Sequence, residues 1–556
     1  MLSDVEYRDY MFKLTSGFTV FMGLLGYLAE TAYREFFESI IKLAQSEEYS
    51  YVIVLFSVIF AVFYLSIRRI GFSYGIRPSK IVFTVALLVL SIAIYSLANV
   101  DLEHRIQLIG LSFACVFIAL LLLVYELNTL SEVVVLLTPL LLIPIPARVI
   151  DTLTPILSKY IGKIAGFVTG ANIIETQGST QLEVISASGE LVRLSVDVAC
   201  TSIMVLSSLL VIIPLLVYII AFSVDKPGRK ALISLISLLI ALLIGLTGSF
   251  VRTLLLLYVT MKLSAEQAYT LLYYSPPLIY SALSVLVMFY FTRRRLKFNT
   301  HWLRSLHRDL VLRATWEYIA GALLLVVVIT GIMGITLHVI NADLRVPSIT
   351  VNTTSVLDYL QNPAGYLSTS KVELTNSTSD LLSTRVLGAL RVYKVTVRST
   401  GEIYTGYIEV VDTPARLHTW ELYLTLQGYF VNASWSSDIG DIRVNYISIK
   451  RGNWRGVLAY TIIPVTIKTP TGEHILYTRI SLVGEELSNV TNKLGSTILS
   501  IIQEHAGQVA TSRNIINLVS VLSQSSTFIL SGLFVYFIVV LIYKYKKYKS
   551  RSELYV

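Results

Sequence analysis

The chain has 556 residues, of which 54% are hydrophobic and only 15% are charged, and its mean hydropathy is +0.68. This composition excludes a soluble globular protein, a disordered chain and a secreted disulfide scaffold, and it indicates a membrane protein with several spans. The net charge is +9, but the basic residues cluster beside apolar runs, where they meet lipid headgroups, so no nucleic-acid partner is expected. Because the chain has only two cysteines, a disulfide framework is excluded.

Apolar runs predict about ten membrane spans, since a helix needs about 20 apolar residues to cross the hydrocarbon core. Eight runs are long and uncharged: Tyr51–Ile67, Ile81–Val100, Ile106–Tyr125, Ala199–Val224, Ala231–Val251, Tyr269–Thr292, Tyr318–Ala342 and Ile515–Tyr543. Two are shorter, Leu14–Ala29 and Val133–Ala147, and the second carries three prolines, which favour a re-entrant or broken helix. The first run is expected to remain as a helix, because no signal-peptide cleavage pattern follows it.

Basic clusters beside the spans predict the orientation, because Lys and Arg stay on the cytoplasmic side. With ten spans, the clusters at 68–80, 226–230, 293–297 and 544–551 all lie inside, and both termini are cytoplasmic. The N-x-[ST] glycosylation pattern occurs only at Asn352, Asn376, Asn432 and Asn489, all in the one large loop that the charge rule puts outside. The two signals agree on a multi-pass plasma-membrane protein whose large domain faces outside.

The patterns divide the chain into five parts: N-terminal membrane helices (1–132), a membrane core (133–297), a basic cytoplasmic loop with the ninth span (298–342), an extracytoplasmic domain (343–513), and a final span with a basic tail (514–556). In the outer domain, alternation predicts strands at Arg391–Arg398, Glu402–Val411, Leu422–Val431, Ile442–Ile449, Val457–Lys468 and Ile475–Leu482, and a helix over Glu485–Glu504. We therefore expect a small α+β domain between the last two spans. Because it has no cysteine and no metal-ligand cluster, we expect a binding or scaffolding role and no cofactor or metal.

Cys200 is the first candidate for chemistry. It follows an exposed segment with strand-like alternation, residues 170–198, and stands at the start of an outward-to-inward span. Its thiol is therefore expected at the outer membrane boundary, where a helix N-terminus favours the nucleophilic thiolate. The alternative is a small apolar residue that packs a helix end, as expected for Cys115 in the middle of an apolar run.

Arg252, at the outer end of the next span, is the second candidate, because a charge with apolar sequence on both sides marks a functional site by default. The alternative is an Arg that reaches the headgroups. Since Cys200 and Arg252 stand at opposite ends of one helical hairpin, a thiolate and a guanidinium can meet. Arg stabilises a thiolate or an oxyanion but cannot act as the base. Tyr273, Tyr274 or the more distant His338 would supply the proton for a leaving amine, although interfacial tyrosines also serve as membrane anchors.

These residues resemble the exosortase/archaeosortase family of membrane-embedded cysteine transpeptidases. The resemblance covers roughly residues 139–292, within the membrane core at 133–297. Its motifs are the proline-rich span, the segment Ala199–Ile203 (ACTSI) that opens a span, and Arg252 at the outer end of the next. It implies that Cys200 is the nucleophile and that Arg252 holds the developing negative charge. Tyr273 stands where the family has a third residue, His or Arg, and Ser249 stands where the family often has Asn.

The resemblance also implies the substrates and the reaction. They would be surface proteins with a C-terminal signal made of a short motif, a transmembrane helix and a basic cluster, cleaved outside and transferred to a lipid or another acceptor. Two other hypotheses compete. A catalytically degenerate scaffold, whose outer domain binds envelope partners, would explain the absence of His and Arg between positions 253 and 292. A transporter is suggested by the broken proline-rich helix, but the chain has no pair of similar halves.

Overall fold

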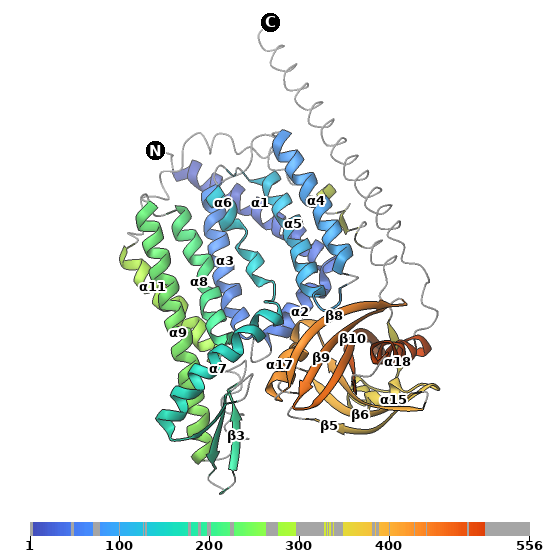
Figure 1. Ribbon diagram of the computed structural model, residues 1–556. Helices are drawn as coiled ribbons and strands as arrows, with labels where there is room; N and C mark the ends of the chain where they lie inside the picture. Colours follow the sequence, from blue (N-terminus) through green and yellow to red (C-terminus); the bar gives the residue numbers. More distant parts are fainter. Residues whose placement is uncertain are drawn as a thin grey trace.

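The computed structural model describes residues 4–45, 49–70, 78–98, 101–125, 130–175, 180–186, 191–196, 202–222, 227–262, 276–295, 348–380, 389–399, 401–427, 429–440, 442–485 and 489–505, together with a few single positions. These residues form a bundle of apolar helices and a β-sheet domain (Figure 1). A second, smaller sheet also belongs to the bundle's chain segment, and both sheets lie at the same end of the bundle.

Most of the predicted runs that the structure describes are helices: α1 (Asp4–Thr31), α3 (Tyr51–Ile70), α4 (Pro78–Ala98), α5 (Arg105–Val124), α8 (Ser202–Phe222), α9 (Pro227–Lys262) and α11 (Pro276–Arg295). Among the described residues, three helical stretches are long and apolar enough to cross a membrane, Arg105–Val124, Ile203–Phe222 and Ala231–Lys262, and four shorter apolar helices accompany them. The predicted run Ile515–Tyr543 lies outside the described residues, and Tyr318–Ala342 is described only at isolated positions.

The proline-rich run Val133–Ala147 is a broken helix, as its prolines predict. Helix α6 (Leu130–Leu136) ends before Pro139, the short 3-10 helix η1 (Thr138–Leu142) follows, and Ile143 is extended, with ψ 125°. Proline has no amide hydrogen and clashes with the preceding turn, so a regular helix cannot continue through this run.

Two amphipathic helices were not predicted, α2 (Arg34–Ala44) and α7 (Ala147–Thr169). On α7, Asp151, Ser158 and Ala165 are buried at heptad spacing, whereas Tyr160 and Phe167 on the opposite face are exposed. The exposed face carries apolar side chains, the buried face carries several small or polar ones, and Lys159 and Lys163 interrupt the apolar sequence. A search for continuous apolar runs therefore misses it.

Helices α8 and α9 form a hairpin in which glycines permit a close approach. A Cβ atom on Gly245 would lie 2.8 Å from Val205 Cα, and one on Gly248 would lie 2.8 Å from the ring of Tyr280 in α11. Small residues at such contacts are typical of helix packing in membranes, where helix association depends on close van der Waals contact. The backbone of α9 thus lies directly against both of its neighbours.

Helix α9 is longer than the span predicted for it. The run Ala231–Val251 was expected to end the helix before Arg252, but α9 continues to Lys262 and has 36 residues. At 1.5 Å per residue it measures about 54 Å, well beyond a hydrocarbon core of about 30 Å. Its C-terminal part covers a protein surface, because apolar residues continue after Arg252.

That surface is the small antiparallel sheet of β1 (Asn172–Glu175), β2 (Thr180–Ile185) and β3 (Leu191–Ser195), in this order. It confirms the strand-like segment expected at 170–198. Leu182 and Leu194 of the sheet pack with Ile161 of α7 and with Leu256 and Leu257 of α9. The sheet, α7 and the extended end of α9 thus share one small core.

The β-sheet domain contains β4 (Ile349–Asn352), β5 (Val372–Ser379), β6 (Arg391–Ser399), β7 (Glu402–Val411), β8 (Phe430–Ile439), β9 (Ile442–Arg451), β10 (Trp454–Thr469) and β11 (Gly472–Glu485). The strand order is β5-β6-β7-β11-β10-β9-β8, with antiparallel neighbours, and β4 pairs in parallel with the end of β10. Its helices are α14 (Val356–Gln361), α15 (Pro363–Leu367), α17 (Trp420–Leu426) and α18 (Val490–His505). The mixed α and β character agrees with the expectation for this region.

Alternate side chains of β10 enter two different cores, as a strand geometry requires. Val457 and Ala459 pack in the core that contains α18, whereas Leu458 and Tyr460 pack in the core that contains α17. Both faces of the sheet are therefore covered, and the side with α17 faces the helical bundle (Figure 1).

The strand predicted at Leu422–Val431 is wrong. Residues Trp420–Leu426 form α17, and β8 begins only at Phe430. The hydroxyl of Thr419 accepts a hydrogen bond from the amide of Leu422 and caps the helix, and Glu421 lies in its first turn, where a negative charge is favourable. The alternating apolar residues of this segment therefore belong to a short capped helix and not to a strand.

Replacing Gly245 by Ala is expected to destabilise the hairpin by about 1–3 kcal/mol, the range for overpacking a well-packed site. The atoms nearest to the new methyl group belong to the backbone of Val205 and Met204, which cannot rotate away. The measurement is the thermal unfolding midpoint of the purified protein in detergent. Gly26→Ala is the matched control, because nothing in the described chain lies within 4 Å of its Cβ position, and equal midpoints for the two variants would contradict the close packing.

Candidate functional site

The residues predicted for catalysis are only partly described. Cys200, Tyr273, Tyr274 and His338 lie outside the described residues, whereas Arg252 lies within α9. Cys200 is separated in the sequence by a single residue from Ser202, the first residue of α8. The geometry of the candidate site is therefore built from Arg252 and from the start of α8.

Arg252 is buried, with 4% of its surface exposed, and lies beyond the start of α8. Gly245 faces Met204 and Val205 of α8 and fixes the register of the hairpin. From that contact, α9 rises about 10 Å to Arg252 and α8 rises about 4 Å to Ser202, at 1.5 Å per residue. Arg252 thus lies about 7 Å beyond the first residue of α8, on the side of the two sheets.

The turn of α9 below Arg252 is tightly bonded. Ser249 is fully buried, and its hydroxyl donates to the carbonyl of Gly245 at 3.0 Å. Thr253 in turn donates to the carbonyl of Ser249 at 2.9 Å. Where the resembled family often has Asn, this chain therefore has a hydroxyl that bonds within its own helix.

Tyr280 is a described tyrosine near this turn that the sequence analysis did not consider. Its ring packs on Gly248, one helical turn before Arg252. The residue lies within α11, four positions after Pro276, and nothing in the local sequence distinguishes it from an ordinary core tyrosine. Only the close approach of α9 and α11 brings it toward Arg252.

Helix α7 anchors the strand that leads to Cys200. The hydroxyl of Ser158 is fully buried, donates to the carbonyl of Val196 at 2.8 Å, and accepts a hydrogen bond from the amide of Thr180 at 2.9 Å. Val196 is the last described residue before Cys200, four positions earlier in the sequence. One side chain of α7 therefore fixes the approach to the predicted nucleophile.

Asp151, two turns earlier on α7, joins the bundle to the β-sheet domain. One carboxylate oxygen lies 2.9 Å from Nδ1 of His418, and the other accepts hydrogen bonds from the amide (2.8 Å) and hydroxyl (2.6 Å) of Thr419. Asp151 and His418 are both buried. A buried carboxylate is costly unless it is fully hydrogen-bonded, so these contacts specify how the two parts meet.

The network continues into the core of the domain. The carbonyl of His418 accepts a hydrogen bond from Nη1 of Arg479 at 2.9 Å, and Arg479 forms an ion pair with the fully buried Glu409. Burial raises the pKa of the Glu409 carboxyl, against the opposing effect of the Arg479 guanidinium. The guanidinium also lies over the ring of Trp420, 5.4 Å from its centroid. The junction is therefore bonded directly to the most buried charges of the domain.

A second contact joins the domain to α2. Arg105 donates to both carboxylate oxygens of Glu35, at 2.7 and 2.8 Å, and the hydroxyl of Tyr477 in β11 donates to the same carboxylate at 2.6 Å. Burial acts to raise the pKa of Glu35, but the guanidinium and these hydrogen bonds outweigh it and hold the pKa below its ordinary value. The domain is thus attached at two separate helices.

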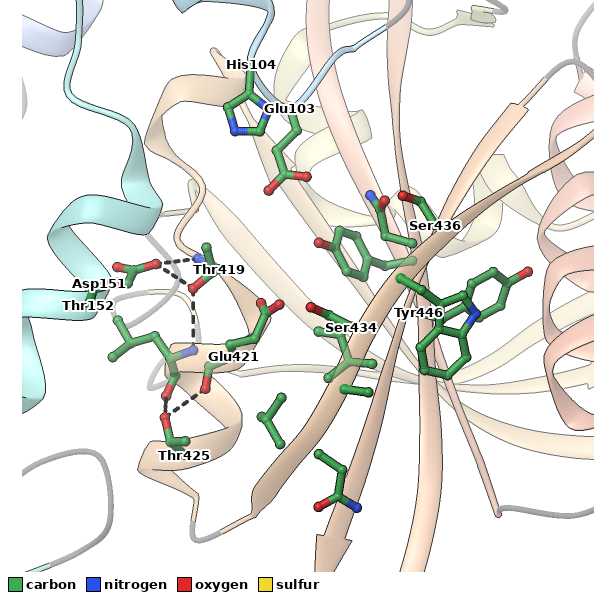
Figure 2. Close-up of a pocket in the computed structure, with 18 of the residues that line it drawn as sticks. Glu103, His104, Asp151, Thr152, Thr419, Glu421, Thr425, Ser434, Ser436 and Tyr446 are labelled. Carbon is green, nitrogen blue, oxygen red and sulfur yellow. Dashed lines mark hydrogen bonds between the residues drawn. The ribbon is translucent and has the colours of Figure 1, made fainter.

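A cavity of about 610 Å³ lies between the bundle and the sheet, beside Asp151 (Figure 2). It is lined by the loop before α5, by the start of α7, by α17 and by strands β8, β9 and β10. Figure 2 shows the carboxyl groups of Glu103 and Glu421 directed into it from opposite sides. Burial raises the pKa of Glu103, and the negative charges of Asp101 and Glu421 add to this effect. The volume is within the range of about 300–1,000 Å³ that is usual for ligand sites.

The sequence alone reveals neither this cavity nor the Asp151 junction. Asp151 and His418 are 267 positions apart, and Glu103 and Glu421 are still further apart, so no local motif connects them. The predicted glycosylation residues Asn352, Asn376, Asn432 and Asn489 are all exposed on the sheet domain, and Asn432 also lines the cavity. Within the described part of the chain, no group of His, Cys, Asp and Glu residues is arranged to hold a metal ion.

Comparisons with other proteins give no relative: no protein-family model, curated protein or solved structure matches this chain. The function must therefore be argued from the residues and the geometry given above.

Asp151→Asn is expected to weaken the junction between the bundle and the domain, because a hydrogen bond to a charged group contributes about 1.5–3 kcal/mol. The measurement is amide hydrogen exchange of α17 and α7 in the purified protein, which should become faster. Asp438→Asn, at an exposed position of β8, is the matched control and should leave the exchange unchanged. Slow exchange in both variants would show that the junction does not depend on this carboxylate.

Proposed function

We propose that the chain is a membrane-embedded cysteine peptidase or transpeptidase that acts on surface proteins at the outer face of the membrane. The observation that carries the proposal is the buried Arg252, about 7 Å beyond the first residue of α8, together with Cys200 two positions before that residue in the sequence. A buried guanidinium at a membrane boundary is costly and is retained for a function. A thiol at the adjacent helix start is the group whose chemistry such a charge assists.

The proposed reaction uses each group according to its chemistry. The Cys200 thiolate, favoured by the N-terminus of α8 and by Arg252, attacks a backbone carbonyl of the substrate, and a carbon–sulfur bond forms. Arg252 stabilises the oxyanion of the tetrahedral intermediate. The carbon–nitrogen bond then breaks, and the leaving amine takes a proton from a general acid. An acceptor amine, hydroxyl or water attacks the thioester, gives up its proton to the same group, and releases the thiolate.

The general acid must be a group other than Arg252, which keeps its proton. Tyr273 occupies the third position by resemblance, and Tyr274 and His338 are the other candidates from the sequence. The described Tyr280 is a further hydroxyl on the helix that packs against α9. A tyrosine is a weaker acid than a histidine at neutral pH, so we expect slow turnover.

The topology that supports this proposal has ten spans, cytoplasmic termini, and the sheet domain with its four glycosylated asparagines outside. Both sheets lie at one end of the bundle (Figure 1), in keeping with this proposed orientation. The substrates are surface proteins with a C-terminal motif, a transmembrane helix and a basic cluster. The acceptor is a lipid or another envelope nucleophile, and no metal or cofactor is needed.

The test compares the C-terminal peptides of surface proteins from wild-type, Cys200→Ala and Arg252→Ala strains by mass spectrometry. Loss of the C-terminal helix and tail in the wild type only is the expected result, with processing reduced by at least about 100-fold in each variant, as for removal of an oxyanion donor. Cys115→Ala is the matched control, because this other cysteine is buried within α5. Intact processing in the Cys200→Ala strain would exclude the proposed chemistry.

A scaffold without catalysis is the second candidate, favoured by the two buried contacts that hold the sheet domain on α7 and α2 and by the lack of His and Arg at positions 253–292. It predicts that Cys200→Ala has no phenotype, whereas deletion of residues 343–513 abolishes function.

A further inference from the structure

The cavity between the bundle and the sheet contains two carboxyl groups that form no ion pair with the described residues. Among the described residues, the carboxylates of Glu103 and Glu421 take part in no hydrogen bond or ion pair, and their charges repel each other across the space. Arg479 and His104 act on Glu103 electrostatically and oppose the rise of its pKa, but the direct partner of Arg479 is Glu409 and that of His104 is Asp101. The cavity therefore has an excess of negative charge directed toward its interior.

Tyr460 gives a second, independent indication of a ligand. It lines the cavity and is only 6% exposed, yet its hydroxyl makes no hydrogen bond to any described residue. Both Glu103 and Glu421 act on it electrostatically, so the three polar groups converge. Buried polar groups are normally hydrogen-bonded, and an exception in a cavity calls for a ligand. A cation that donates several hydrogen bonds, such as an ammonium group, satisfies all three at once.

One wall of the cavity suits a polypeptide better than a small amine. Residues Val431–Ser436 of β8 line it, and β8 is the edge strand, which pairs only with β9 among the described strands. An edge strand offers free amide and carbonyl groups to an extended chain. Asn445 and Trp435 add a hydrogen-bonding side chain and an aromatic surface to the same wall.

Helix α7 connects the cavity to the strand that precedes Cys200 in the sequence. Pro155 of α7 lines the cavity, and Ser158, about one helical turn further, bonds to Val196 at the end of that strand.

We propose that this cavity is a substrate subsite that binds a basic side chain, between Glu103, Glu421 and Tyr460, on an extended polypeptide segment held along β8. The identity of that segment as the extracytoplasmic part of a sorted surface protein rests on the function proposed above. The binding of a basic side chain by the cavity does not depend on cleavage.

The experiment measures peptide binding to the full-length protein in nanodiscs, in the Cys200→Ala background so that no turnover occurs. The probes are a fluorescent ten-residue Gly/Ser peptide with one central lysine and the same peptide with norleucine. We expect the lysine peptide to bind at least about tenfold more tightly, as for a charge pair that is removed from water. Glu103→Gln combined with Glu421→Gln should abolish this preference. Glu373→Gln, on β5 at the opposite edge of the sheet, is the matched control and should retain it.

Equal binding of the two peptides, or a lysine preference that survives the double substitution, would overturn the proposal. Competition with n-butylamine separates the two sources of an ammonium group. If n-butylamine displaces the lysine peptide only at a concentration at least about a hundredfold above that of the peptide, the result supports a polypeptide site. The reason is that the main chain of the peptide adds contacts along β8. Displacement at equal concentration would identify a small-amine site and exclude the polypeptide.

The thermal midpoint of the double variant should equal or exceed that of the parent, since a repulsion is removed, and a large decrease would show that the carboxylates are structural.

The outcomes also separate this inference from the proposed function. A lysine preference together with unchanged surface-protein processing in the Cys200→Ala strain would exclude the peptidase and leave the subsite. Processing that depends on Cys200, together with no lysine preference in the binding assay, would exclude the subsite and leave the peptidase.

Discussion

The junction between the two parts of the molecule depends on one buried carboxylate. Asp151 cannot be removed from water without full compensation, and the compensating groups, His418 and Thr419, belong to a loop and a helix cap of the other domain. The same Thr419 hydroxyl starts α17, so folding of the cap and docking of the domain are coupled. The cavity wall, the helix that covers the sheet and the start of α7 all take their positions from this contact.

Helix α7 connects the junction to the helical bundle. Within three turns it holds Asp151 at the junction, Pro155 at the cavity and Ser158 at the strand before Cys200. On α9, the glycine contact with α8 sets the depth of Arg252. Arg252 and the strand before Cys200 are thus connected to the β-sheet domain through helices, in keeping with the principle that a functional site needs support beyond its own residues.

Features with a local or periodic cause were predictable from the sequence. Long apolar runs located α3, α5 and α8, the prolines located the break after α6, and alternation located most of the large sheet. The length of α9 was not predictable from hydropathy alone, because the apolar letters after Arg252 cover protein rather than lipid. Helix α17 was misread as a strand, since Leu422, Leu424 and Leu426 alternate while the cap at Thr419 decides the structure.

The candidate site was predictable only in part. Arg252 was found because a charge within apolar sequence is conspicuous, whereas Glu103, Glu421 and Asp151 resemble ordinary surface carboxylates in the sequence. Their role arises from contacts between segments about 270 or more residues apart, which depend on the tertiary fold and have no local signal. The burial of Tyr460 behind them has the same origin.

The two attachment points of the sheet domain also set its mechanical freedom. A rigid body fixed at one point can still turn about three axes, but a body fixed at two points can turn only about the line that joins them. Asp151 with Thr419 and Glu35 with Tyr477 are such points, on two different helices. Ala415 and Leu422 of the domain also pack in the core of the helical bundle, so turning about that line would require separating this apolar contact as well.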